Sequence, residues 1–187
     1  MILPGILSSQ ISGHLYSYST DFYQIATATV TSGGATTITF SSIPGTYKHL
    51  QLRVLAASNS AGPDTDDLSF QFNGDTGANY VGHALSGNGS AASAGYNPAA
   101  SSNRSLRVGA NNGSAFGAGF IDILDYTNVN KNKVGRSLGG VDWNGGGNAT
   151  MESLLWLNTA AITSMTIVPK YGTSWLQYSS FALYGAN

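Results

Sequence analysis

Short stretches in which apolar and polar residues alternate recur along the chain, and they constrain its fold more than any other feature. Leu50, Leu52 and Val54, for example, are separated by single polar residues. A period of two is typical of a β-strand whose two faces meet different surroundings. No stretch of a dozen residues has the three-to-four spacing of an amphipathic helix. The sequence therefore predicts an all-β protein.

The alternating segments are bounded by Gly, Asn, Ser or Pro, which are typical turn residues. We expect strands at 24–30, 36–40, 49–56, 68–72, 80–85, 106–109, 119–124, 134–141, 153–158, 164–168 and 179–184. So many short strands, each with one buried face, fit two packed sheets, so we expect an antiparallel β-sandwich with a jelly-roll topology. Its predicted core contains Leu50, Leu52, Val54, Phe70, Phe72, Ile121, Ile123, Trp156, Ile167, Phe181 and Leu183.

Two segments depart from this pattern. Residues 86–103 are mostly small and polar, so we expect a surface loop that is mobile or ordered by a partner. Residues 1–20 are interrupted by Pro4 and Gly5, and their apolar side chains either fold back over the sandwich or form an arm that docks on another subunit. These side chains are Ile2, Leu3, Ile6, Leu7, Ile11 and Leu15. We expect an extended arm at 1–20 and a sandwich domain at 21–187.

Charge is scarce and balanced. Charged residues make up 9% of the chain and the formal net charge is −1. Without a basic surface, no nucleic-acid partner is expected. The chain has no cysteine, which excludes disulfides, thiolate metal sites and a cysteine nucleophile. The first apolar run is short and contains a proline, so neither a signal peptide nor a membrane span is expected.

A search for catalytic residues yields one motif match. Residues 135–139 fit the GxSxG pattern around Ser137, but no helical pattern follows and no histidine comes later in the chain. The three histidines, His14, His49 and His83, lie too far apart in sequence for a local zinc pair. Glu152 is the only glutamate. We therefore expect no enzymatic activity, no metal and no cofactor.

Two groups of side chains leave a choice of roles. The carboxylates of Asp64, Asp66, Asp67 and Asp75 could cap turns, which we expect, or supply oxygen ligands to calcium.

The aromatic residues Trp143, Tyr171 and Trp175 are expected in loops, beside Asn, Asp or Gln. Such rings can stack on a carbohydrate, anchor a subunit interface or pack into the core. The sequence leaves these three roles open.

Several longer runs carry a resemblance to a known group. They are SIPGTYKHLQLRV, FNGDTGANY, IDILDYTNVNKNKVGRSLGG, LLWLNTAAITSMTIVP and SSFALYG, together with the opening ILPGIL. The chain resembles small virion proteins of tailed bacteriophages from about residue 24 onward. The resemblance implies a virion structural protein, foremost a capsid decoration or cement protein that forms a homotrimer and binds the major capsid protein or another virion protein. It also fits a tail or fibre adhesin that binds host-surface carbohydrate.

Overall fold

Twelve β-strands make up the protein, which we describe from a computed structural model over residues 22–62, 64–110 and 115–187. The strands are β1 (Phe22–Thr29), β2 (Ile38–Phe40), β3 (His49–Ala56), β4 (Thr65–Phe72), β5 (Tyr80–Gly87), β6 (Ala92–Ala100), β7 (Asn103–Gly109), β8 (Gly117–Leu124), β9 (Lys133–Trp143), β10 (Gly146–Trp156), β11 (Met165–Pro169) and β12 (Ser180–Ala186). Within these ranges no helix is long and apolar enough to cross a membrane.

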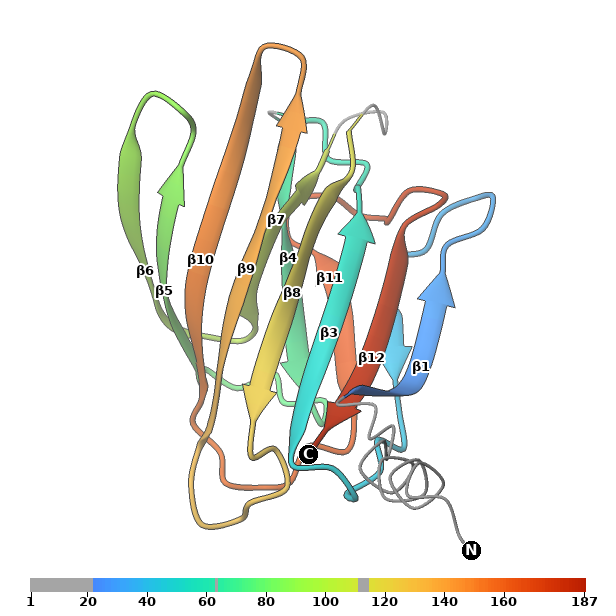
Figure 1. Cartoon of the computed structure of the whole chain (residues 1–187), viewed down its shortest axis with the longest axis vertical. Helices are drawn as coiled ribbons and strands as arrows, with labels where there is room; N and C mark the ends of the chain where they lie inside the picture. Colours follow the sequence, from blue (N-terminus) through green and yellow to red (C-terminus); the bar gives the residue numbers. More distant parts are fainter. Residues whose placement is uncertain (1–21, 63, 111–114) are drawn as a thin grey trace, which may run out of the picture.

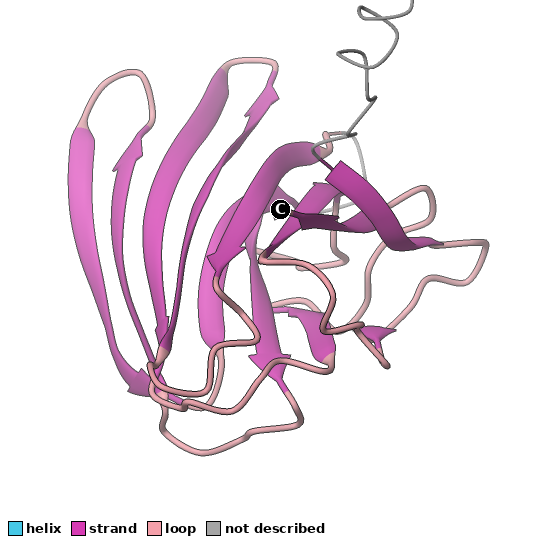
Figure 2. Ribbon diagram, turned by 60° about the horizontal axis from the view of Figure 1, so that its bottom comes forward, coloured by secondary structure: helices cyan, strands magenta, loops and turns pink. Residues whose placement is uncertain are grey.

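The strands form two sheets of unequal width (Figure 1). The larger sheet has the order β1-β12-β3-β8-β9-β10-β5-β6, and the smaller has the order β2-β11-β4-β7. Neighbouring strands are antiparallel throughout both sheets. The predicted antiparallel sandwich is confirmed, whereas the jelly-roll topology is not. A tilted view shows the β5–β6 end of the larger sheet extending past the smaller one (Figure 2).

The core lies between the two sheets and contains every side chain that alternation assigned to it. Leu52, Phe70 and Ile121 have no exposed surface, and the other predicted core residues are also buried. Phe70 and Phe72 of the smaller sheet pack with ring centroids 4.9 Å apart, and Phe72 reaches Trp156 of the larger sheet. These contacts join the two layers because each strand turns its alternate side chains toward the other sheet.

A β-bulge in β7 fits the two sheets together. Asp67 pairs with Arg107 and Leu68 with Ser105, so Leu106 is left without a partner in the ladder. Its backbone is left-handed, with φ at 59°, and its side chain is buried. A Cβ on either Gly119 or Gly139 would come within 2.6 Å of its Cδ2 atom. Glycine on β8 and β9 is therefore what allows β7 to pack closely against the larger sheet.

The prediction of a surface loop at 86–103 is wrong. This segment belongs to a β-hairpin of β5 and β6 with a tight turn, in which Gly89 has φ at 85°. Most of β6 is exposed on both faces. An edge strand without a core face does not need alternating apolar residues, so its small residues carried no strand pattern. We call the β5–β6 hairpin the wing.

The expected arm is not part of the described structure. Residues 1–20, including Ile2, Leu3, Ile6, Leu7, Ile11 and Leu15, lie outside the described residues. Both alternatives for these side chains stay predictions.

Phe70 tests the core assignment. Replacing it with Ala should lower the free energy of unfolding by about 3 to 5 kcal/mol, because a fully buried ring is lost and a cavity remains. Leu138→Ala is the matched control, since Leu138 is half exposed and its truncation should cost far less. Denaturant unfolding measures both. Equal effects of the two substitutions would contradict the burial described here.

Candidate functional site

The outer face of the larger sheet, which points away from the smaller sheet, carries a continuous apolar row. Register aligns Phe120 of β8 with Leu138 of β9, Leu138 with Met151 of β10, Met151 with Leu85 of β5, and Leu85 with Ala94 of β6. The exposed fractions of Leu138, Met151 and Leu85 are 50%, 54% and 53%. Large apolar side chains that stay about half exposed on adjacent strands indicate a surface for another protein. We call these five residues the apolar row.

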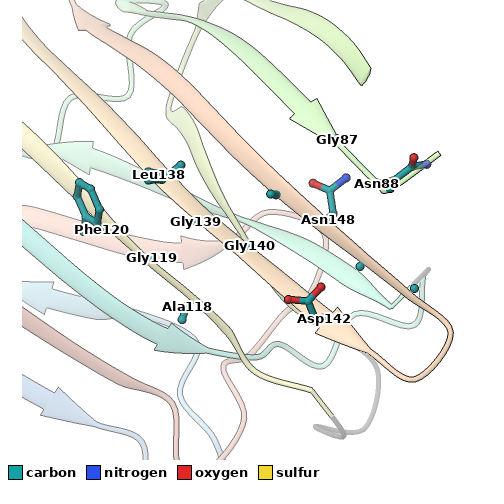
Figure 3. Close-up of a pocket in the computed structure, with 14 residues that line it drawn as sticks. Gly87, Asn88, Ala118, Gly119, Phe120, Leu138, Gly139, Gly140, Asp142 and Asn148 are labelled. Carbon is teal, nitrogen blue, oxygen red and sulfur yellow. The ribbon is translucent and has the colours of Figure 1, made fainter. Parts of the chain in front are cut away.

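A shallow depression lies beside this row (Figure 3). It has a volume of about 700 Å³ and is bordered by Phe120 and Leu138 on one side and by Asp142 and Asn148 on another. Glycine occupies much of its floor, and a Cβ at Gly140 would meet the Asn148 carbonyl oxygen at 2.6 Å. The depression therefore exposes backbone and small side chains next to large apolar ones.

Three charged residues of the outer face, Asp122, Arg136 and Arg53, already have partners within the sheet. Asp122 lies 3.4 Å from Arg136 and accepts a hydrogen bond of 2.8 Å from the Gln51 side chain. The guanidinium of Arg53 lies over the rings of Phe22 and Tyr184, at 4.9 and 4.5 Å. A partner that covers this face would meet paired charges beside apolar side chains, which lowers the cost of desolvation.

The carboxylates of Asp66 and Asp67 are buried and serve the fold. Asp66 accepts hydrogen bonds from the Ser58 hydroxyl at 2.6 Å and from the backbone N–H of Tyr171 and Gly172. Asp67 lies 3.3 Å from both Arg104 and Arg107. Burial raises the pKa of Asp67, while the two guanidiniums oppose that shift.

Asp75, the more distant carboxylate of this group, is tied to the core. It accepts hydrogen bonds from the indole N–H of Trp156 at 2.7 Å and from the Asn79 amide, and these bonds lower its pKa. No cluster of three metal-ligating side chains occurs within residues 22–62, 64–110 and 115–187. Asp66, Asp67 and Asp75 are thus engaged in hydrogen bonds or ion pairs within the fold.

Glu152 has the most unusual environment of the acidic residues. It projects inward from β10, is 6% exposed, and lines a cavity of about 180 Å³ with Arg104 and Asn97. Burial raises the pKa of its carboxyl to about 7, with the Arg104 charge opposing the shift. Nothing in the sequence distinguished this residue beyond its being the only glutamate.

The three aromatic residues have different surroundings. Trp175 is fully buried, packs edge-on against Phe181 and pairs its backbone with Ala35, so of the three roles left open it takes the core. Trp143 ends β9 and is partly buried, with its ring over Gly146. Tyr171 is 61% exposed and lines a cavity of about 570 Å³. Of these three aromatic residues, Tyr171 and Trp143 are accessible to a ligand and Trp175 is not.

The GxSxG match does not have the geometry of a nucleophile elbow. Ser137 lies in the middle of the uninterrupted strand β9 with its side chain buried, whereas the elbow requires a sharp turn from strand to helix. His83 stacks on Tyr96 and His49 lies 3.8 Å from Asp125, so the two described histidines lie in separate surroundings.

Comparisons with known proteins give no match to a family model, a curated protein or a solved structure. The resemblance to phage virion proteins thus depends on the sequence runs quoted above. The role of the chain has to be argued from its surfaces, of which the outer face is the most distinctive.

Glu152 predicts how stability depends on pH. Its pKa is higher in the folded chain, at about 7, than the ordinary value of 4.5 for a glutamate carboxyl. The folded state therefore binds more protons between these values, so its stability is greatest below about 4.5 and falls as pH rises through 7. Glu152→Gln should match the parent near pH 4 and exceed its unfolding free energy by up to about 3 kcal/mol at pH 8.5. Equal stabilities at both pH values, measured by chemical denaturation, would refute the assignment.

Proposed function

We propose that this protein is a structural component of a tailed-phage virion, foremost a capsid decoration or cement protein, which binds its neighbours through the outer face of its larger sheet. The observation that carries the proposal is the apolar row. Its members come from five adjacent strands, so the sheet itself holds them in one line. The resemblance to small phage virion proteins, which rests on the sequence runs quoted above, suggests the biological setting.

The physical character of the chain supports an assembly role. Strand pairing and a packed core hold the outer face rigid, so a partner can bind without first ordering a loop. The face offers few charges, and among them Asp122 and Arg136 lie 3.4 Å apart. The major capsid protein or another virion protein is the proposed partner, and the threefold assembly implied by the resemblance stays a prediction.

Substitutions in the apolar row test this proposal. Leu138→Glu or Met151→Glu should weaken binding to phage particles assembled without the protein by at least about tenfold, because a charge would be buried at the contact. Both side chains are half exposed, so the fold should tolerate the changes. Co-sedimentation with particles measures the binding. Val129→Glu is the control, since Val129 is 62% exposed in the segment between β8 and β9. Undiminished binding by both row variants would contradict the proposal.

A second candidate function, carbohydrate binding by a tail or fibre adhesin, is favoured by the cavity at Tyr171. Ser60, Thr65 and Arg107 border this cavity and offer hydroxyl and guanidinium donors beside the exposed phenol ring. An aromatic ring beside such donors is suited to a sugar, whose ring has an apolar face and hydroxyl edges.

Glycan-array binding tests the second candidate. Tyr171→Ala should abolish binding to any glycan that the parent protein retains. Tyr178→Asn is the matched control, because Tyr178 is 70% exposed outside this cavity and its left-handed backbone accommodates asparagine. If the parent binds no glycan, or if Tyr171→Ala still binds it, the adhesin role at this cavity is refuted.

A further inference from the structure

The free edge of β6 is uncharged and unpaired within the described structure. The larger sheet ends at β6, and no described strand pairs with the far side of this strand. Its residues from Ala92 to Ala100 include no charged side chain. Proteins commonly protect such edges with lysine, proline or a bulge, because the exposed backbone N–H and C=O groups can pair with another strand.

The wing's hydrogen bonds show which backbone groups of β6 point outward. At the turn, the N–H of Asn88 donates to the carbonyl of Ala91, so these residues face each other. Facing and outward pairs alternate along an antiparallel ladder. Ala92, Ala94 and Tyr96 therefore direct their N–H and C=O groups to the free edge.

The opposite side of β5 gives the same alternation. The N–H of Leu157 donates to the carbonyl of Asn79, so these two residues form a hydrogen-bonded pair. Every second residue of β5 from Asn79 onward then directs its backbone N–H and C=O groups to β10, and these residues include His83 and Leu85. Their partners across the wing are Tyr96 and Ala94, which must then point to the free edge.

The available edge has defined ends. On one side it stops at the tight turn that contains Gly89. On the other, Pro98 lacks an N–H group, and a register shift between Tyr80 and Gly82 marks a bulge in the ladder. The unprotected stretch is therefore Ala92 to Tyr96.

We propose that a second copy of this chain pairs with this stretch, β6 against β6 in antiparallel orientation, around a twofold axis at Ala94. Ala94 then faces the partner's Ala94, and Ala92 faces the partner's Tyr96. Each outward pair exchanges two backbone hydrogen bonds. A shift of the register by two residues in either direction would bring Pro98 or the turn into the ladder and lose bonds.

The side chains fit this twofold arrangement. Ala94 ends the apolar row, so pairing at Ala94 joins the rows of two copies into one line across the axis. Alanine opposite Tyr96 leaves room for the phenol ring, which is 60% exposed in the single chain. The facing residues on the other side of the strand, Ser93 and Gly95, are small, so a second copy meets neither like charge nor bulk. A strand with charged edge residues would lack this complementarity to itself.

The pairing of β6 with β6 of a second copy goes beyond the proposed function, because it concerns the free protein in solution. The full chain should sediment with twice the mass of one chain, whereas the homotrimer that the resemblance implies would give three times that mass. Ala94→Lys and Ala94→Glu should each weaken the dimer by at least about tenfold, because like charges would face each other at the axis. An equimolar mixture of the two variants should restore the dimer, since Lys then faces Glu. Ala99→Lys, beyond Pro98, is the control and should stay dimeric.

Cross-linking tests the register independently. The chain contains no cysteine, so Ala94→Cys introduces a single thiol. Facing Cα atoms in a hydrogen-bonded pair lie about 5.5 Å apart, within the range of a disulfide. Mild oxidation should convert most of this variant into a covalent dimer, while Ala99→Cys should stay monomeric on a denaturing gel. A monomeric parent at all concentrations, or dimers unaffected by charge at Ala94 and uncross-linked through Ala94→Cys, would overturn the proposal. Neither result would affect the particle-binding test of the outer face.

Discussion

The packing of an eight-stranded sheet against a four-stranded sheet is the constraint on which the rest of the structure depends. Strand β7 of the smaller sheet lies across β8, β9 and β10, and core side chains of β3 and β12, such as Leu52 and Phe181, are buried as well. Strand β6 of the wing is mostly exposed, and the outer face points away from the smaller sheet (Figure 1). A chain of this composition has few charges with which to solvate such surfaces. The unequal widths of the two sheets thus explain both the stable core and the apolar surface that we assign to assembly.

The margin of the smaller sheet is where buried charges replace apolar packing. Asp67 is held by Arg104 and Arg107 on either side of the β7 bulge, and Glu152 approaches Arg104 from β10. Lys133, also buried, donates hydrogen bonds to the carbonyl oxygens of Asn128, Lys131 and Thr159. Pairing and hydrogen bonding offset part of the desolvation of these groups, but burial still raises the pKa of the Asp67 and Glu152 carboxyls. We therefore expect the free energy of unfolding to fall as pH rises through 7.

Much of the fold was predictable because alternation reports burial directly. The strand expected at 49–56 has the predicted bounds, and the predicted core residues are buried. The wing was missed because β6 has no core face. The start of β10 was predicted at 153 but lies at Gly146, because glycine and asparagine are typical loop residues and hid the first part of the strand. Trp175 was expected in a loop but is buried, since an irregular segment can still supply a core side chain.

The outer face could have been anticipated only in part. Leu138 and Phe120 occupy positions where alternation calls for polar residues, and these exceptions were visible in the sequence. Their alignment into a row depends on the strand order and register, which a single sequence does not reveal. Glu152 likewise has a raised pKa because it is buried, and the cavity that it lines is formed by strands β5, β6 and β7, which are distant in the chain.

A cryo-electron microscopy reconstruction of a particle that carries this protein would test the central claim most directly. The account predicts that the apolar row on β8, β9, β10, β5 and β6 lies against a neighbouring protein, with Leu138 and Met151 buried in that contact. A reconstruction in which this face is open to solvent while the protein is attached through the smaller sheet would contradict it.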